Sequence, residues 1–193
     1  MEAFYTIQGE GCWQGHAAFF IRLAGCKVGC FWCDVKESWQ IDAHPTATVE
    51  EILQQAVQYP ARIAVITGGE PLMHNLFPLT RALKAAGFRT HLETSGAYPL
   101  SGTWDWICFS PKKFMAPCPE IYAHANELKV IIYNKSDFAF AEQFAKVVPT
   151  HCQLLLQPEW EKSSQMMPFI VEYVKKNPQW RISLQTHKFM NIP

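Results

Sequence analysis

The stretch Ala24-Gly-Cys-Lys-Val-Gly-Cys-Phe-Trp-Cys-Asp34 carries three cysteines in the order C-x-x-x-C-x-x-C. They are Cys26, Cys30 and Cys33. Cysteine thiolates are the usual ligands of iron–sulfur clusters, and three of them hold three irons of a [4Fe–4S] cube. Because no fourth cysteine is close in the sequence, one iron would stay open to a small molecule. The stretch therefore predicts a cluster loop with a vacant coordination position.

Zinc and disulfide chemistry are the alternatives for these cysteines. A structural zinc site usually needs four ligands in two pairs. Here there is one triplet, and the other cysteines are scattered along the chain: Cys12, Cys108, Cys118 and Cys152. Disulfides form in oxidising compartments, whereas the N-terminus lacks the basic and apolar regions of a signal peptide. The total of seven cysteines is odd. These observations favour a cluster in a cytoplasmic protein.

Length and composition indicate one domain over residues 1–193 with a substantial core. Hydrophobic residues make up 49% and aromatic residues 13% of the chain, so enough apolar surface is present for burial. The 17 basic and 17 acidic residues cancel, which predicts no nucleic-acid partner and no membrane-surface partner. The apolar runs are too short for a membrane span.

Short apolar strands alternate with amphipathic helices along the chain. Thr48 and Glu51 have the spacing of a capping box at the start of a helix, and Gly87 is placed to end the helix expected over 76–86. Further helices are expected over 137–147 and 168–176. Seven strands are expected, over 18–23, 62–67, 90–93, 106–109, 128–132, 152–156 and 181–184.

This alternation predicts an α/β fold with a parallel sheet. Seven strands are too few to close an eight-stranded barrel. We therefore expect an incomplete TIM-type barrel, in a compact variant with fewer helices because some crossovers must be loops.

Polar residues follow five of the expected strands. In parallel α/β folds the active site lies at the carboxyl ends of the strands, so five such endings and the cluster loop predict one shared mouth. Taken singly, Gly68-Gly69 would be an ordinary turn, Lys112 a loop lysine and His187 a surface histidine. The five endings are Thr67-Gly-Gly-Glu-Pro71, Glu93-Thr-Ser-Gly96, Ser110-Pro-Lys112, Gln157-Pro158 and Gln185-Thr-His-Lys188.

Two further features indicate ligand binding near this mouth. Arg22 lies in the apolar strand Phe19-Phe-Ile-Arg-Leu23, where an unpaired charge is prohibitive, so it must find an anion. A ligand carboxylate would satisfy it with a bidentate contact. In Gly9-Glu-Gly11 the two glycines allow backbone to approach a flat ligand closely. The alternative is an ordinary turn before the strand.

These motifs together resemble the 7-carboxy-7-deazaguanine synthase family of radical S-adenosylmethionine (SAM) enzymes. The Gly-Gly-Glu-Pro motif and the cysteine triplet are common to many radical SAM enzymes, whereas the first and last matching stretches are more specific. The resemblance covers nearly the whole chain. The matching stretches are Ile7-Gln-Gly-Glu-Gly11, Phe20-Ile-Arg22, Gly25-Cys26 to Trp32-Cys-Asp34, Thr67-Gly-Gly-Glu-Pro71, Glu93-Thr-Ser-Gly96, Ser110-Pro-Lys112, Gln157-Pro158 and Leu184-Gln-Thr-His-Lys188.

The resemblance implies a carbon–nitrogen lyase with a [4Fe–4S] cluster and SAM as cofactors. One electron from the cluster cleaves SAM to methionine and a 5′-deoxyadenosyl radical, which takes a hydrogen from C6 of 6-carboxy-5,6,7,8-tetrahydropterin. The ring contracts, ammonia leaves, and 7-carboxy-7-deazaguanine is formed for queuosine and other 7-deazapurines. A homodimer and an electron donor such as flavodoxin are further implications. Aromatic residues such as Trp160 or Trp180 could serve the dimer if they are exposed, and a core role for them is an equal alternative.

The family's residue roles transfer onto matching positions of this sequence. Cys26, Cys30 and Cys33 hold the cluster and are the candidate catalytic residues. The candidate SAM contacts are Trp32, Cys33, Asp34, Gly69, Ser110, Pro111, Lys112, Gln157, Pro158, Glu159 and Trp160. The candidate pterin contacts are Ile7, Gln8, Gly9, Arg22, Thr67 and the C-terminal Pro193.

Val35 departs from the family pattern. Many members have threonine directly after the Cys-Asp pair, where its hydroxyl helps to hold Mg²⁺ beside the substrate. Valine has no side-chain oxygen, and Mg²⁺ demands oxygen ligands. We therefore expect a weak or absent Mg²⁺ requirement.

Two other functions are compatible with the cysteine triplet. One is a different radical SAM reaction, such as activation of a partner protein by forming a glycyl radical. The other is a non-enzymatic iron–sulfur or zinc-binding module, which would not cleave SAM.

Overall fold

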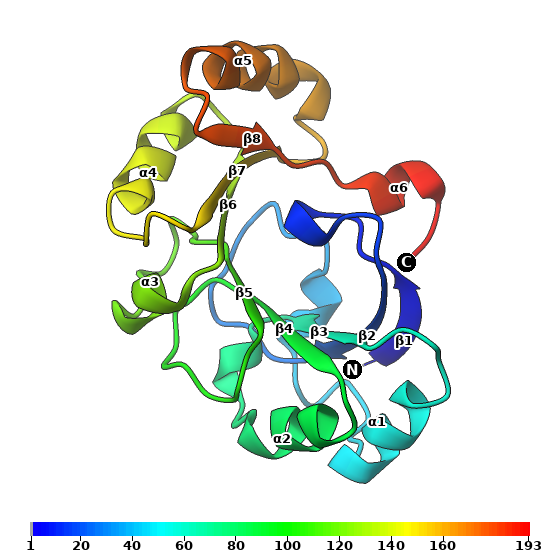
Figure 1. Cartoon of the computed structure of the whole chain (residues 1–193). Helices are drawn as coiled ribbons and strands as arrows, with labels where there is room; N and C mark the ends of the chain where they lie inside the picture. The colour runs from blue at the N-terminus through cyan, green and yellow to red at the C-terminus, as the bar shows by residue number, and fades with distance from the viewer. Residues whose placement is uncertain (1) are drawn as a thin grey trace.

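Eight strands form one sheet that curves into an open barrel (Figure 1). The computed structural model describes residues 2–193, and Met1 lies outside them. The strands follow one another in chain order from β1 to β8. The β1–β2 pair is antiparallel, and the six later pairs are parallel. Within the described residues the outer strands β1 and β8 do not pair, so the barrel is incomplete, as predicted.

The boundaries of most elements lie within a few residues of those expected. The strands are β1 (Glu2–Ile7), β2 (Ala17–Leu23), β3 (Ile63–Gly68), β4 (Arg89–Thr94), β5 (Trp106–Phe109), β6 (Glu127–Ile132), β7 (Gln153–Pro158) and β8 (Trp180–Ile182). The α-helices are α1 (Val49–Ala56), α2 (Phe77–Ala85), α3 (Glu120–His124), α4 (Ser136–Ala145), α5 (Ser163–Lys176) and α6 (Thr186–Met190). Three short 3₁₀ helices are η1 (Gly11–Trp13), η2 (Lys36–Trp39) and η3 (Pro71–Met73).

The expectation of seven strands was wrong by one, because Glu2–Ile7 forms β1. This edge strand lies opposite β2, with Tyr5 facing Phe19 in the register. The rings of Phe4 and Phe20 stack with centroids 5.4 Å apart. The helices α3 and α6 were also not predicted. Each has five residues, too few for a 3.6-residue periodicity to be recognised.

Helices pack on the outside of the sheet, and the main core lies between the two layers (Figure 1). The predicted capping box at Thr48 and Glu51 is present, and Gly87 has φ 82° beyond the end of α2. Trp180 belongs to this core, since it is 1% exposed, so it is not an exposed dimer contact. No helix within residues 2–193 is long and apolar enough to cross a membrane.

Side chains of β6 alternate between the core and the barrel interior. Leu128, Val130 and Ile132 are buried in the core, whereas Lys129 and Ile131 line a cavity inside the barrel. This alternation follows from the pleat of a strand. It explains how a strand packed against helices also presents a charged group to the interior.

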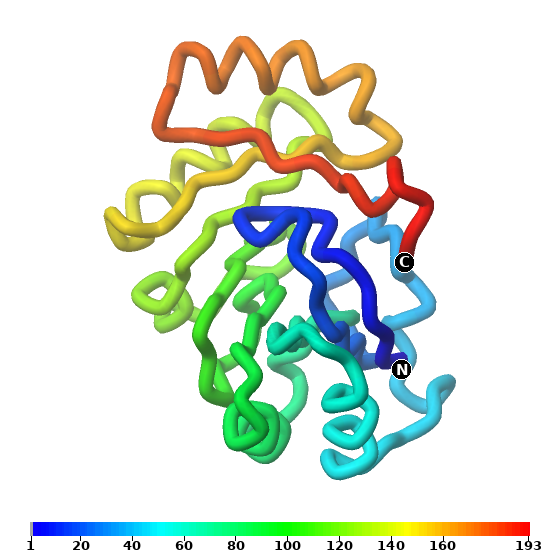
Figure 2. Tube along the Cα trace, turned by 45° about the vertical axis from the view of Figure 1, so that its right-hand side comes forward, coloured from blue at the N-terminus to red at the C-terminus, as the bar shows by residue number. Residues whose placement is uncertain are grey.

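The connection between β1 and β2, residues 8–16, turns into the barrel, and we call it the hairpin end. Figure 2 shows it in blue, lying beneath the orange-red segment that contains β8. It contains η1, which contacts β6. The chain's two ends also meet here, because Thr186 N donates to Gly9 O at 2.9 Å. The open side of the barrel is thus occupied by segments from both ends of the sequence.

Candidate active site

The three cysteines of the cluster loop line one cavity of about 300 Å³ inside the mouth of the barrel. All three are free thiols, and Cys33 N donates to Cys30 O at 2.9 Å. Burial raises the pKa of Cys26, and it raises the pKa of Cys30 to about 11. Iron binding would replace the protons of these thiols, because the thiolate is the form that binds a metal.

No three His, Cys, Asp or Glu side chains in residues 2–193 are placed to hold one metal ion together. A cubane cluster does not need that arrangement, because each thiolate binds a different iron. The donor set of three cysteines on one loop, facing one cavity, therefore fits a [4Fe–4S] cluster.

The Gly-Gly-Glu-Pro motif packs directly against the start of the cluster loop. Gly69 N donates to Leu23 O at 2.9 Å, and Glu70 N donates to Gly25 O at 2.8 Å. A Cβ atom on Gly69 would lie 2.3 Å from Gly25 O, closer than atoms can approach. The glycine is thus required for close backbone packing, which is more than an ordinary turn demands.

Glu70 joins this motif to the end of β4. Its carboxylate is 1% exposed and accepts hydrogen bonds from Leu72 N at 3.1 Å, Thr94 Oγ1 at 2.5 Å and Ser95 N at 2.8 Å. The Ser95 hydroxyl also donates to it. A buried carboxylate held by several donors fixes the ends of β3 and β4 relative to each other.

The remaining candidate SAM contacts complete what we call the cluster wall of the cavity. Ser110 and Lys112 follow β5, and Lys112 Nζ donates to Ser110 O and Ser110 Oγ, each at 2.6 Å. Pro111 is buried and is the one candidate that does not line the cavity. The candidates that line it are Trp32, Cys33, Asp34, Gly69, Ser110, Lys112, Gln157, Pro158, Glu159 and Trp160.

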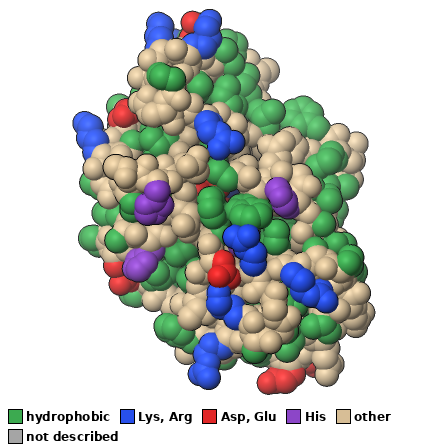
Figure 3. Space-filling view, in the orientation of Figure 1, with side chains coloured by type: hydrophobic (Ala, Val, Ile, Leu, Met, Phe, Trp, Pro, Cys, Tyr) green, Lys and Arg blue, Asp and Glu red, His purple; other side chains and the backbone are tan. Residues whose placement is uncertain are grey.

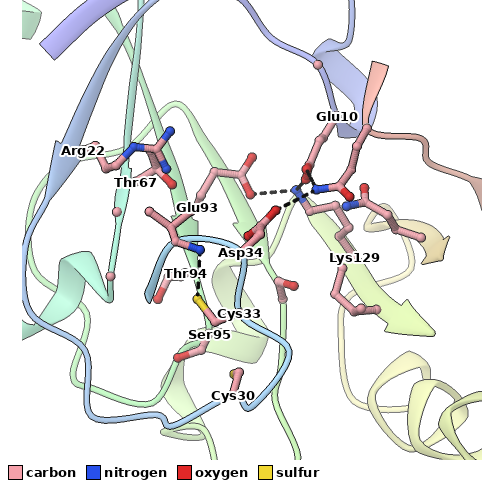
Figure 4. A pocket seen from close by; sticks show the side chains of 18 of the residues that line it. Glu10, Arg22, Cys30, Cys33, Asp34, Thr67, Glu93, Thr94, Ser95 and Lys129 are labelled. Atoms are coloured by element: carbon pink, nitrogen blue, oxygen red, sulfur yellow. Dashed lines mark hydrogen bonds and ion pairs between the residues drawn. The ribbon is translucent and has the colours of Figure 1, made fainter. Parts of the chain in front are cut away.

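A second part of the cavity lining, which we call the hairpin wall, contains every candidate pterin contact. These are Ile7, Gln8, Gly9, Arg22, Thr67 and Pro193, and all six line the cavity. Figure 4 shows Arg22 beside Thr67, across the cavity from Glu10 and Lys129. Arg22 Nε donates to Glu2 Oε1 at 2.7 Å, so a neighbouring strand already supplies one anion. Its guanidinium nevertheless lines the cavity.

A buried lysine that we did not predict also belongs to the hairpin wall. Lys129 is 4% exposed, and its Nζ donates to Glu10 Oε2 at 2.7 Å and to Glu93 Oε2 at 3.0 Å (Figure 4). Its position within the apolar run Leu128-Lys-Val-Ile-Ile132 was the available signal. The same argument that singled out Arg22 applies to it.

Charges in this triad act on one another. Burial alone would raise the pKa of Glu10, but the Lys129 ammonium lowers it to about 2. Burial raises the pKa of Glu93, against the opposing effect of Lys129. Burial would also lower the pKa of Lys129, yet the surrounding Cys108, Glu10 and Glu93 hold it well above its usual value. The lysine is therefore a fixed cation at neutral pH.

The C-terminal segment connects the two walls. Lys188 Nζ donates to Asp34 Oδ2 at 2.8 Å, and Gln185 Nε2 donates to Glu10 Oε1 at 2.9 Å. His187 also lines the cavity, and a Cβ on Gly9 would lie 2.3 Å from its ring. The glycine at position 9 thus accommodates the His187 ring where its Cβ would be, and it also lines the cavity where a flat ligand is expected. His187 is not the surface histidine considered above.

Exposed hydrophobic side chains lie on the surface of the molecule. On the face seen in Figure 3, hydrophobic side chains gather near the centre, with Lys or Arg and Asp or Glu side chains beside them. Trp160 is 39% exposed, and its ring meets that of Phe189 with centroids 5.4 Å apart. Phe31 in the cluster loop is 55% exposed.

A family model described as the radical SAM superfamily matches residues 20–107. That match, the open parallel barrel and the cysteine loop at its mouth define a radical SAM enzyme, whose cofactors are a [4Fe–4S] cluster and SAM. The chain belongs to the 7-carboxy-7-deazaguanine synthase family.

Three comparisons carry this assignment. The 7-carboxy-7-deazaguanine synthase of Flavobacterium psychrophilum is 57% identical over 193 residues, which are 100% of this chain and 91% of that protein. The enzyme of the same name from Synechocystis is 53% identical and aligned over 99% of this chain and 91% of its own length. The crystal structure of QueE from Escherichia coli superposes with a TM-score of 0.83 at 34% identity, covering 95% of this chain and 91% of that one.

Proposed function

We propose that this enzyme converts 6-carboxy-5,6,7,8-tetrahydropterin to 7-carboxy-7-deazaguanine with loss of ammonia. The observation that carries the proposal is a single cavity shared by three cysteines and all six candidate pterin contacts. A substrate held on the hairpin wall would lie next to SAM held on the cluster wall. When bound, the reduced cluster and SAM supply the radical that removes a hydrogen from the substrate.

The cluster wall would bind SAM through backbone and side chains that are already fixed. Gly69 keeps the end of β3 close to the cluster loop, so both would border the space that takes the methionine part of SAM. The Ser110 and Lys112 side chains contact each other at 2.6 Å, which orients the lysine toward the same space. Trp32 and Trp160 provide flat apolar surfaces beside it.

The hairpin wall would bind the pterin through charge and hydrogen bonding. Arg22 would present its guanidinium to the substrate carboxylate. Its Nε already donates to Glu2, so the substrate would be a second anion for the same side chain. Gln8, Gly9 and Thr67 would contact the ring system, and the C-terminal Pro193 would close the cavity over it. Lys129 keeps Glu10 ionised and ordered, so the polar end of this wall is organised before substrate binds.

An anaerobic turnover assay tests the proposal. The protein is reconstituted with iron, sulfide and a reductant, and SAM cleavage is measured with and without 6-carboxytetrahydropterin. We expect SAM cleavage together with formation of 7-carboxy-7-deazaguanine. SAM cleavage without this product would favour another radical SAM reaction, such as glycyl-radical activation. The absence of any SAM cleavage would favour a non-enzymatic metal-binding module.

Two cysteine variants assign the activity to the cluster loop. Cys30→Ala removes one of three iron ligands, so SAM cleavage is expected to be lost. Cys118→Ala is the matched control, because Cys118 is also a free thiol but does not line the cavity. Full SAM cleavage by Cys30→Ala would refute the cluster assignment.

We further infer a homodimer of single-domain chains that receives electrons from a donor such as flavodoxin. The exposure of Phe31, between two cluster cysteines, supports access to the cluster loop from the surface. One sheet that contains all eight strands supports a single domain. Seven free thiols suit a reducing compartment such as the cytoplasm. Sedimentation of the reconstituted enzyme tests the dimer, and turnover driven by reduced flavodoxin tests the donor.

A further inference from the structure

The hairpin end is held inside the barrel by side chains from several strands. Gly11 N donates to Ser183 Oγ at 3.0 Å, and Cys12 N donates to Glu127 Oε2 at 2.9 Å. The Trp13 ring packs against His91 and Trp106, with centroids 4.8 and 5.7 Å away. The segment immediately before these anchors, residues 8–10, lines the cavity.

Glu127 is an unusual member of this set of anchors. It is 1% exposed and is not among the residues that line the cavity. Besides Cys12 N, its carboxylate accepts from Trp106 Nε1 at 3.3 Å and from Cys108 Sγ at 3.3 Å. Within residues 2–193, no Lys, Arg or His lies at ion-pair distance from it. A buried carboxylate satisfied only by neutral donors is costly to keep.

Gly11 of the hairpin end packs so closely against the Glu127 carboxylate that no side chain fits at position 11. Gly11 has φ +69°, and a Cβ on it would lie 2.2 Å from Glu127 Oε1. A side chain at position 11 would therefore push the hairpin end away from β6. Gly11 and Glu127 together set how deeply the hairpin end sits in the barrel.

We propose that Glu127 is a positioning residue, which holds the hairpin end at the depth where Gln8 and Gly9 meet the pterin. This inference rests on the proposed function, because that function assigns those two residues to substrate binding. Glu127 acts through the Cys12 amide, and it makes no contact with the substrate. Loss of Glu127 should therefore weaken pterin binding and leave the cluster wall, which the hairpin end does not form, unchanged.

Glu127→Gln tests this proposal with little change in shape. Glutamine keeps one oxygen that can still accept from Cys12 N, but it removes the negative charge and replaces the second acceptor with a donor, so this anchor of the hairpin end is weakened. We expect KM for 6-carboxytetrahydropterin to rise about tenfold, as for loss of a hydrogen bond to a charged group. The kcat should fall much less, and SAM cleavage without the pterin should stay within about twofold of wild type.

Glu142→Gln is the matched control. Glu142 also accepts from an indole, Trp180 Nε1 at 2.8 Å, and from Tyr173 OH at 2.6 Å, but it does not line the cavity or contact the hairpin end. Its variant should lose stability without a change in the KM for the pterin. Equal changes in KM in both variants would indicate general destabilisation and would overturn the proposal.

A second perturbation and a measurement on the wild type remain decisive if Glu127→Gln does not fold. Gly11→Ala should raise the same KM, because its Cβ displaces the hairpin end. In the wild type, the pterin should slow amide hydrogen exchange in residues 8–16. An unchanged KM in either folded variant, or unchanged exchange there, overturns the proposal. Absence of pterin turnover by the wild type would instead overturn the proposed function.

Discussion

The two walls of the cavity are built by different physical means. The cluster wall depends on backbone packing, in which Gly69 allows β3 to touch the cluster loop and Glu70 ties the ends of two strands together. The hairpin wall depends on charged and polar side chains that join distant parts of the chain. Lys129 bridges Glu10 and Glu93, and Thr186 bonds Gly9.

This difference predicts different sensitivities. A wall made by close backbone approach should respond to added volume and little to charge. A wall held by buried ionisable groups should respond to loss of one charge and to pH, because an unpaired buried charge is expensive. Changes to the hairpin wall should therefore have larger effects than changes to the cluster wall.

Lys129→Met should cause the largest loss of stability. It removes the cation shared by Glu10 and Glu93, which leaves two neighbouring carboxylates without a partner. Breaking a buried ion pair costs about 3–5 kcal/mol. Because both carboxylates keep about a fifth of their side-chain surface exposed, we expect the lower end, about 3 kcal/mol, in anaerobic urea unfolding of the reconstituted protein.

Lys84→Met provides the comparison for this measurement. Lys84 forms an ion pair with Asp105 at 2.5 Å, but both side chains are about one-third exposed. Such surface pairs contribute about 0–1 kcal/mol. If both variants lost the same small amount, the stability of the hairpin wall would not depend on its buried triad.

His91 should make the same wall sensitive to acid. It packs against Trp13 of the hairpin end and is 3% exposed. Burial, with Arg89 nearby, lowers its pKa from 6.5 to about 4, while Asp105 opposes and His16 adds to this lowering. Between pH 6.5 and pH 4, His91 is protonated in the unfolded chain but stays neutral in the folded protein. Stability is therefore lost as the pH falls from 6.5 toward 4.

The expected size of this effect is about 2 kcal/mol between pH 7 and pH 5. His91→Phe keeps an aromatic ring against Trp13 and removes the titration. The wild type should lose about 2 kcal/mol more than this variant when urea unfolding is compared at the two pH values. Equal losses would show that His91 is protonated in the folded protein near its ordinary pKa.

A wall could be predicted from the sequence to the extent that its contacts join residues close together in the chain. The cluster wall was readable in the sequence, because the cysteine loop, Gly69 and Lys112 stand in short motifs at strand ends. The hairpin wall was readable only in part. Arg22 and the stretch Gly9-Glu-Gly11 stood out in the sequence, but Gly9 meets His187 and Glu10 meets Lys129 only after the barrel forms. The SAM contacts and the pterin contacts were both assigned by the family resemblance. Lys129 carried a local signal, a lysine in an apolar strand, which applied equally to Arg22.

The same limit applied to the fold, whose local pattern could be predicted and whose long-range contacts could not. Alternating strands and helices indicated the incomplete parallel barrel, and the cross-strand order then follows from parallel βαβ connections. The β1 strand was missed because it is an antiparallel edge strand whose partner is chosen by the hairpin end. That hairpin end is held by Glu127 and Ser183, which lie more than a hundred residues away.

Val35→Thr tests the cluster wall and should have the smallest effect. Val35 lines the cavity two residues after Cys33, at the position where the family resemblance implies a threonine hydroxyl that would help to hold Mg²⁺. With no side-chain oxygen, the wild type should turn over at rates within about twofold with Mg²⁺ and with EDTA, since Mg²⁺ requires oxygen ligands. The threonine variant should become several-fold more active with Mg²⁺ than with EDTA. Val57→Thr, at an exposed position, controls for the substitution itself. Strong activation of the wild type by Mg²⁺ would show that substrate and water suffice to bind the ion, and that the cluster wall tolerates the loss of this oxygen.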